Sequence, residues 1–153
     1  MKNSRKGFTL VELLIVIVVI GVLSTMMMLS STEAVTSAKA SNIVSNLRNL
    51  KTAALSWYAD NLSTAETSGF KLSDKKSEIA KYMSNEGLGD YEFVGNENSG
   101  TWFVYINNTD SRVGDKLISR KSAVGLWKVT TSSNAGVSAD LTDKTGNVGM
   151  FIR

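Results

Sequence analysis

A single carboxylate, Glu12, lies inside an otherwise apolar stretch near the start of the chain. The stretch runs from Phe8 to about Leu29, and as a helix it would extend roughly 33 Å, which is enough to cross a bilayer. A charged group at the centre of such a helix costs about 2.5–3.5 kcal/mol unless a partner offsets it. The chemistry open to Glu12 is therefore the pairing with a positive group, and the sequence must supply that partner.

A basic leader precedes the apolar stretch and carries Lys2, Arg5 and Lys6. The next basic residue is Lys39, so the charge asymmetry places the N-terminus in the cytoplasm and the rest of the chain outside. An ordinary secretory signal peptide is the competing interpretation. Glu12 would interrupt its apolar region, and Ser24–Glu33 offers no clean small-x-small cleavage site. We therefore expect a single-pass precursor that is embedded in membrane lipids.

The motif Lys6-Gly7-Phe8-Thr9-Leu10-Val11-Glu12 resembles the class III signal of type IV prepilins and the related pseudopilins. The resemblance covers roughly the first third of the chain. It implies that a prepilin peptidase cleaves after Gly7 on the cytoplasmic side and that the new terminal Phe8 is N-methylated. A slim residue before the scissile bond suits a peptidase that cuts at the membrane face.

The same resemblance implies a route of assembly. Cleavage creates a positive amine at Phe8, and Glu12 of a neighbouring subunit can neutralise it. Because removal of one member of a buried ion pair costs about 3–5 kcal/mol, the pair would fix the register of docking. We expect the apolar surface from Val11 to Leu29 to pack into the core of a homopolymer, which grows at an inner-membrane assembly platform and becomes an extracellular pilus. A head-to-tail contact of this kind does not close on itself.

Composition disfavours an enzyme. The chain has no His and no Cys, which removes imidazole acid–base groups, thiol nucleophiles and the usual metal ligands, so we expect no cofactor. The lone carboxylates Glu66, Glu78, Glu86 and Asp90 are expected to solvate the surface. Without disulfides, the exported part is expected to hold together by packing alone.

The net charge belongs to the leader. The chain has 17 Lys and Arg against 14 Asp and Glu, and because residues 1–7 carry three bases and no acid, the remainder balances at 14 and 14. The sequence pI of about 9.2 is therefore no indication of nucleic-acid binding. Asp140 and Asp143 resemble part of a loose calcium loop but lack its ligand count. A hairpin turn centred on Lys144–Gly146 is favoured there, and Ser63 and Thr64 are conceivable glycan acceptors.

The sequence predicts an α+β fold in which a helical spine is packed on a small antiparallel sheet. Its parts are the cleaved leader 1–7, the transmembrane and filament-core helix 8–29, the amphipathic continuation 30–61 and the globular head 62–153. In the continuation, apolar residues recur at helical spacing: Ala40, Ile43, Leu47, Leu50, Ala54, Trp57 and Tyr58. Because the chain has no proline, we expect one continuous helix. Any unwinding in a filament should fall between Gly21 and Thr32.

In the head, Ser73 or Asp74 is predicted to cap a short helix that reaches about Asn85. Its buried side is expected to comprise Ile79, Tyr82 and Met83. Strand-like segments follow at Tyr91–Gly95, Thr101–Asn107, Val124–Thr130 and Asn147–Ile152, with a short helix or an irregular crossing at Val113–Ser122. The three tryptophans, Trp57, Trp102 and Trp127, are each expected in the core.

The favoured function is that of a structural subunit of a type IV pilus. A pseudopilin of a type II secretion system or of a competence pilus remains open within the same superfamily. A membrane-anchored adhesin that never polymerises is the alternative from a different class, and the presence of Glu12 argues against it.

Overall fold

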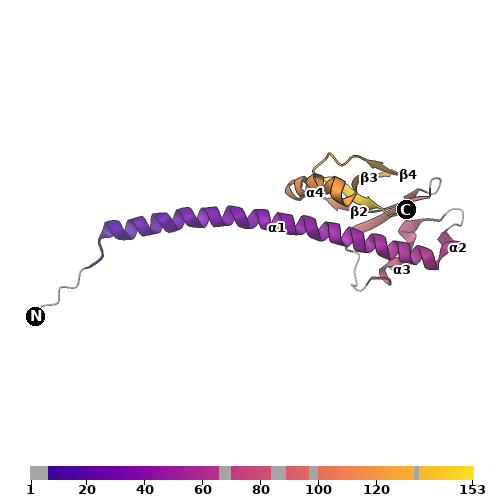
Figure 1. Ribbon diagram of the computed structural model, residues 1–153, viewed down its shortest axis with the longest axis horizontal. Helices are drawn as coiled ribbons and strands as arrows, with labels where there is room; N and C mark the ends of the chain where they lie inside the picture. Colours follow the sequence, from indigo (N-terminus) through magenta and orange to yellow (C-terminus); the bar gives the residue numbers. More distant parts are fainter. Residues whose placement is uncertain (1–6, 66–69, 84–88, 97–99, 133–134) are drawn as a thin grey trace, which may run out of the picture. The chain divides into compact units, whose positions relative to one another are not determined.

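The computed structural model describes residues 7–65, 70–83, 89–96, 100–132 and 135–153 (Figure 1). Lys2, Arg5 and Lys6 lie outside the described residues. The chain divides into two units, Met1–Val35 and Thr36–Arg153, which are treated separately below. One helix, α1 (Leu10–Asp60), contributes to both units.

In the first unit, α1 carries apolar side chains on all its sides between Leu10 and Met28, with Glu12 as the charged exception, and every side chain from Phe8 to Met28 is exposed. The helix has 51 residues in all. Its most apolar 18-residue window has a mean hydropathy of 2.7, so by length and composition the helix can cross a membrane. The predicted single helix is thus confirmed, and the absence of proline explains why no break occurs.

The second unit is an α+β head built on a five-stranded antiparallel sheet. Its elements are α2 (Leu62–Ala65), the 3-10 turn η1 (Leu72–Lys75), α3 (Lys76–Ala80), β1 (Tyr91–Asn96), β2 (Thr101–Asn108), α4 (Ser111–Val124), β3 (Leu126–Ser132), β4 (Ala135–Ala139) and β5 (Gly146–Phe151). The strand order is β1-β2-β5-β3-β4. The last strand therefore lies in the middle of the sheet, where it pairs with β2 and β3.

The core lies where the second half of α1, the helix α4 and one face of the sheet meet. The predicted stripe on α1 is confirmed, since Leu47 and Ala54 have no exposed surface and Trp57 is 1% exposed. The residues that meet the stripe come from the strands and α4: Phe93, Val104, Val113, Leu117, Val148 and Met150. The sequence indicated this contact because side chains spaced by three and four residues share one helix face.

Phe70 and the two buried tryptophans form an aromatic cluster at the C-terminal end of α1. The ring of Phe70 lies 5.6 Å from those of both Trp57 and Trp102. The Arg153 guanidinium lies 4.0 Å from the ring centre of Tyr58, which in turn makes an edge contact with Trp102. This cluster joins α1, β2 and the end of the chain.

The third tryptophan contradicts the sequence prediction. Trp127 on β3 is 41% exposed, whereas its neighbour Leu126 is 4% exposed and faces the core. Adjacent strand residues point to opposite faces of a sheet, so the register that buries Leu126 turns Trp127 outward. Of the three tryptophans, only Trp57 and Trp102 are core residues.

The region between α1 and β1 also departs from the prediction. Lys71 and Lys75 hold the N-cap positions, and Ser73 and Asp74 lie inside η1, so the predicted cap is wrong. Ile79 is buried, but Tyr82 is 41% exposed. The Tyr82 hydroxyl donates to Asp60 Oδ2 at 2.8 Å.

The segment 140–145 is a crossing and does not form the predicted hairpin turn. It connects β4, which pairs with β3, to β5, which pairs with β2 and β3. Leu141 anchors the segment, with 1% of its surface exposed. The Asn108 amide donates to Lys144 O at 3.0 Å.

Three ion pairs fasten the same segment to its surroundings: Lys121 with Asp140, Lys128 with Asp143, and Lys144 with Asp115. Packing is therefore not the only interaction that holds this cysteine-free head.

Candidate assembly site

The start of α1 holds Glu12 in a reciprocal capping arrangement with Thr9. The Thr9 backbone N–H and its hydroxyl each donate to Glu12 Oε2 at 2.8 Å. The Glu12 backbone N–H donates to Thr9 Oγ1 at 3.2 Å. Two N–H groups that the helix itself cannot satisfy thus receive side-chain partners.

Thr9 is a site residue that the sequence reasoning missed. The signal was present, because Thr9-Leu10-Val11-Glu12 has the threonine-x-x-glutamate spacing of a capping box directly before an apolar run. The cap supplies hydrogen bonds to the Glu12 carboxylate, but it supplies no compensating charge. Glu12 therefore remains available to a cation.

The predicted cleavage site lies in non-helical backbone immediately before α1. Gly7 and Phe8 are both outside the helix, and Phe8 is 87% exposed. A Cβ atom added at Gly7 would meet nothing within 4 Å. The packing of the chain therefore does not require glycine at this position. Any such requirement would come from the peptidase that is expected to bind there.

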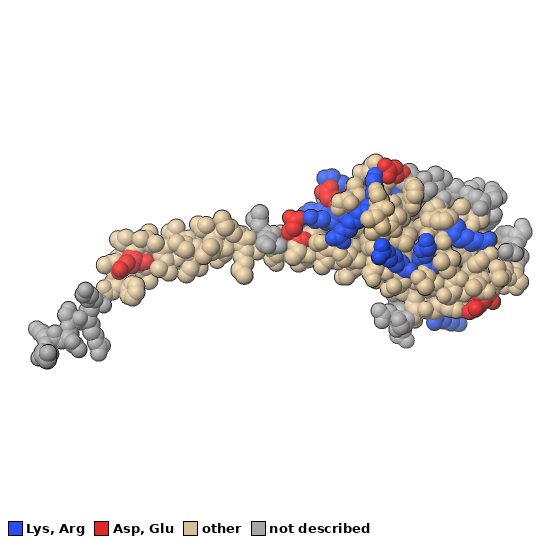
Figure 2. Space-filling view, viewed as in Figure 1, with Lys and Arg blue, Asp and Glu red and all other residues tan. Residues whose placement is uncertain are grey.

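The apolar surface beyond Glu12 has no cover in the isolated chain. Leu13 is 61% exposed, Ile17 60% and Leu23 60%. Glu12 is the only charged residue between Phe8 and Met28, and Figure 2 shows one acidic group on this otherwise uncharged length of helix. Such a surface requires lipid or other apolar chains around it, and any charge that meets it must do so at Glu12.

The candidate calcium residues are engaged elsewhere. Asp140 accepts from Lys121 Nζ at 2.7 and 2.9 Å, and Asp143 pairs with Lys128. Across the described part of the chain, no three acidic, His or Cys side chains gather in a group that could hold a metal ion. Ser63 and Thr64 are exposed on α2.

Comparisons with known proteins agree with the geometry at the start of α1. The family described as the prokaryotic N-terminal methylation motif matches residues 2–28. A fimbrial protein of Dichelobacter nodosus is 30% identical over 154 residues, and the match covers 94% of both chains. The type IV major fimbrial protein FimA of the same organism is also 30% identical, with 94% of both chains covered. No solved structure matches the chain.

These relatives match nearly the full length of the chain, so the likeness includes the head as well as the signal. Together with the methylation motif and the long apolar helix, they show that the chain belongs to the type IV pilin family.

Proposed function

We propose that this chain is the structural subunit of a type IV pilus. A prepilin peptidase cleaves after Gly7, Phe8 becomes the N-methylated terminus, and the processed subunits polymerise through their apolar helices. In each docking step, Glu12 of one subunit pairs with the Phe8 amine of another. Before assembly the precursor is a single-pass membrane protein with its N-terminus in the cytoplasm. After assembly it lies in a fibre on the cell surface.

The observation that carries this proposal is the position of Glu12. It is the sole acidic residue between Phe8 and Leu29, and it lies in the first turn of a helix whose surrounding side chains are apolar and exposed. A carboxylate there destabilises both the membrane-embedded and the packed helix unless a cation meets it. The amine that cleavage creates is the nearest cation that the mature chain offers, because no basic residue follows until Lys39.

The capping arrangement supports a change of partners during docking. In the precursor, Thr9 provides two hydrogen bonds to Glu12 Oε2. These bonds are already charge-assisted, because their acceptor is ionised, but they bring no positive charge; a neighbouring amine would add it. The hydrogen bonds from Thr9 thus lower the cost of the membrane-embedded carboxylate before assembly. Pairing with the amine lowers the free energy further in the docked state.

The proposal is tested by replacing Glu12 with Val in the full-length chain. We expect the variant to be cleaved, which N-terminal sequencing of the membrane fraction measures. Sheared surface fractions should contain few or no filaments in electron micrographs. Gly7→Leu should give the opposite defect, an uncleaved precursor that stays in the membrane.

Glu33→Gln is the matched control, because Glu33 is the next carboxylate along α1 and lies beyond the apolar stretch. It should leave filament yield close to that of the parent. Abundant filaments from Glu12→Val would refute the pairing. A chain that is never cleaved and never found in fibres would refute the proposed function altogether.

A further inference from the structure

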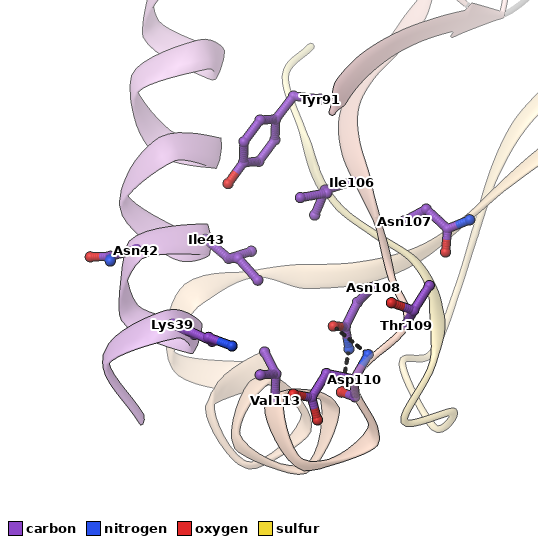
Figure 3. A pocket seen from close by; sticks show the side chains of 10 residues that line it. All are labelled: Lys39, Asn42, Ile43, Tyr91, Ile106, Asn107, Asn108, Thr109, Asp110 and Val113. Atoms are coloured by element: carbon purple, nitrogen blue, oxygen red, sulfur yellow. Dashed lines mark hydrogen bonds between the residues drawn. The ribbon is translucent and has the colours of Figure 1, made fainter. Parts of the chain in front are cut away.

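A groove of about 320 Å³ opens between α1, the sheet and the start of α4. Figure 3 shows Ile43, Ile106 and Val113 as its aliphatic walls, with the Lys39 side chain extending into it from α1. Asn42 and Asn107 also border the groove, but their side chains point away from it (Figure 3). The groove therefore combines an apolar lining with one ammonium group.

The charge of Lys39 is not compensated within the described part of the chain, where no carboxylate lies within ion-pair distance of it. Asp110 also borders the groove, but its carboxylate is already bonded to Arg112. Its Oδ1 accepts from the Arg112 backbone N–H at 3.0 Å and lies 3.5 Å from Arg112 Nε. The backbone hydrogen bond from Arg112 is the main reason that the pKa of Asp110 is lowered. The positive end of the groove thus has no counter-charge among the described residues.

Tyr91 adds a second donor. Tyr91 is 8% exposed, and its hydroxyl accepts from the Asn46 amide at 3.1 Å. The described residues offer that hydroxyl no acceptor for its own proton. Burial raises the pKa of Tyr91, so the proton stays on the oxygen near neutral pH. An ammonium beside aliphatic walls suits a carboxylate carried on a short hydrocarbon stem. The Tyr91 O–H is a further donor at the other end of the groove (Figure 3).

We propose that this groove receives an acidic side chain from a second copy of the chain, with Lys39 as its ion-pair partner. The inference rests on the proposed polymer, in which copies meet one another at high local concentration. Charge balance supports a second copy as the source. Beyond the leader, acidic and basic side chains are equal in number. Within one described chain, however, Lys39, Arg48 and Lys51 of α1 have no acidic partner. Asp74 and Asp90 likewise make no ion pair among the described residues, so a neighbouring copy has carboxylates that can complement Lys39.

Zero-length cross-linking tests the proposal directly. A carbodiimide joins a lysine and a carboxylate in ion-pair contact by an amide bond, and the water that is lost converts the reagent to its urea. Intact filaments and detergent-solubilised subunits are treated in parallel, digested and analysed by mass spectrometry. We expect a cross-linked peptide containing Lys39 in filaments and none in the solubilised subunit.

Two variants sharpen the result. Lys39→Gln should abolish that peptide and lower filament yield about tenfold, which corresponds to the loss of one charged contact. Lys71→Gln is the control, because Lys71 is an exposed lysine outside the groove, and it should change neither measurement. Circular dichroism of the solubilised variants should match that of the parent.

The outcomes separate the two proposals. Normal filaments in which Lys39 is not cross-linked, or in which Lys39→Gln has no effect, would overturn the groove contact and leave the pilus subunit intact. The same Lys39 peptide in solubilised subunits would show that the carboxylate comes from the same chain and would also overturn it. Failure to find filaments of the parent chain would overturn both.

Discussion

The Thr9 backbone N–H and the Glu12 carboxylate are joined by a 2.8 Å hydrogen bond across the first turn of α1. The bond ties the residue that follows Phe8 to the charge proposed to receive a neighbour's Phe8 amine. The four residues from Thr9 to Glu12 therefore start the helix and also position its acidic side chain. The fold of this turn and its chemistry cannot be changed independently.

Thr9→Val should weaken assembly without preventing cleavage. The substitution keeps the shape of the side chain but removes the hydroxyl that donates to Glu12 and accepts from its N–H. Loss of such a cap costs about 1 kcal/mol, and the carboxylate loses one donor. We expect a several-fold lower filament yield in sheared fractions. Thr9→Ser, which retains the hydroxyl, should behave like the parent, and equal yields from Val and Ser would argue against the role of the cap.

Glu78 should make the head sensitive to acid. Its carboxylate accepts from Lys75 Nζ at 2.7 Å and from Trp57 Nε1 at 3.1 Å. These bonds, Lys75 first, lower the pKa of Glu78 below its usual value of 4.5. A lowered folded-state pKa gives stability that is present above the unfolded value and is lost as pH falls through the folded one. Thermal unfolding of the full chain in detergent should therefore show a smaller loss of Tm below about pH 4.5 in Glu78→Gln than in the parent. Parallel curves for the two proteins would contradict this.

Gly114→Ala should be among the most damaging substitutions in the head. A Cβ atom at this position of α4 would lie 1.7 Å from the backbone oxygen of Lys144. Because neither backbone can give way easily, we expect the free energy of unfolding to fall by about 3 kcal/mol or more, measured by chemical denaturation. Gly21→Ala is the control, because its Cβ atom would meet nothing within 4 Å. It should leave the unfolding of the head unchanged.

The crossing segment 140–145 should depend more on Leu141 than on its ion pairs. Leu141 is 1% exposed, whereas the side chain of Asp140 is 70% exposed and that of Asp143 is 54% exposed. Leu141→Ala should cost about 2–4 kcal/mol. Each exposed ion pair is worth about 0–1 kcal/mol. In denaturant titrations, Asp140→Asn combined with Asp143→Asn should therefore cost less than Leu141→Ala, and the reverse order would show that the ion pairs dominate.

The sequence predicted those parts of the fold that depend on local periodicity. The stripe on α1 follows from spacings of three and four residues, and the chain has no proline that could interrupt it. The strand β4 does not stand out because Ala135-Gly136-Val137-Ser138-Ala139 is made mostly of small residues with little β propensity. The central position of β5 depends on contacts between residues far apart in the chain, which local patterns do not encode.

The sequence also does not show which face of a strand points toward the core. A two-residue alternation indicates a strand, but it does not say which face meets the core. The position of Trp127 in a strongly patterned strand favours the core, but the register of the sheet turns its side chain outward. At the assembly site, Glu12 stood out because a charge in an apolar helix is costly. Thr9 does not stand out in the sequence because a hydroxyl at a helix start is common.

In a filament, we expect any unwinding of α1 to fall between Gly21 and Thr32. This window contains Gly21, which favours the helix less than alanine by about 1 kcal/mol. It also contains two hydroxyls that already bond to helix carbonyls: Ser24 Oγ donates to Ile20 O at 2.7 Å, and Thr25 Oγ1 donates to Val22 O at 2.7 Å. When backbone bonds open inside an apolar core, such hydroxyls can keep carbonyl groups satisfied. Unwinding should therefore cost least here.

A cryo-EM map of the filament measures the helix directly, and a break within Ile43–Leu50 would contradict the prediction. Ser24→Ala combined with Thr25→Val should shorten or abolish any unwound stretch, and an unchanged stretch in that variant would show that the hydroxyls do not support it.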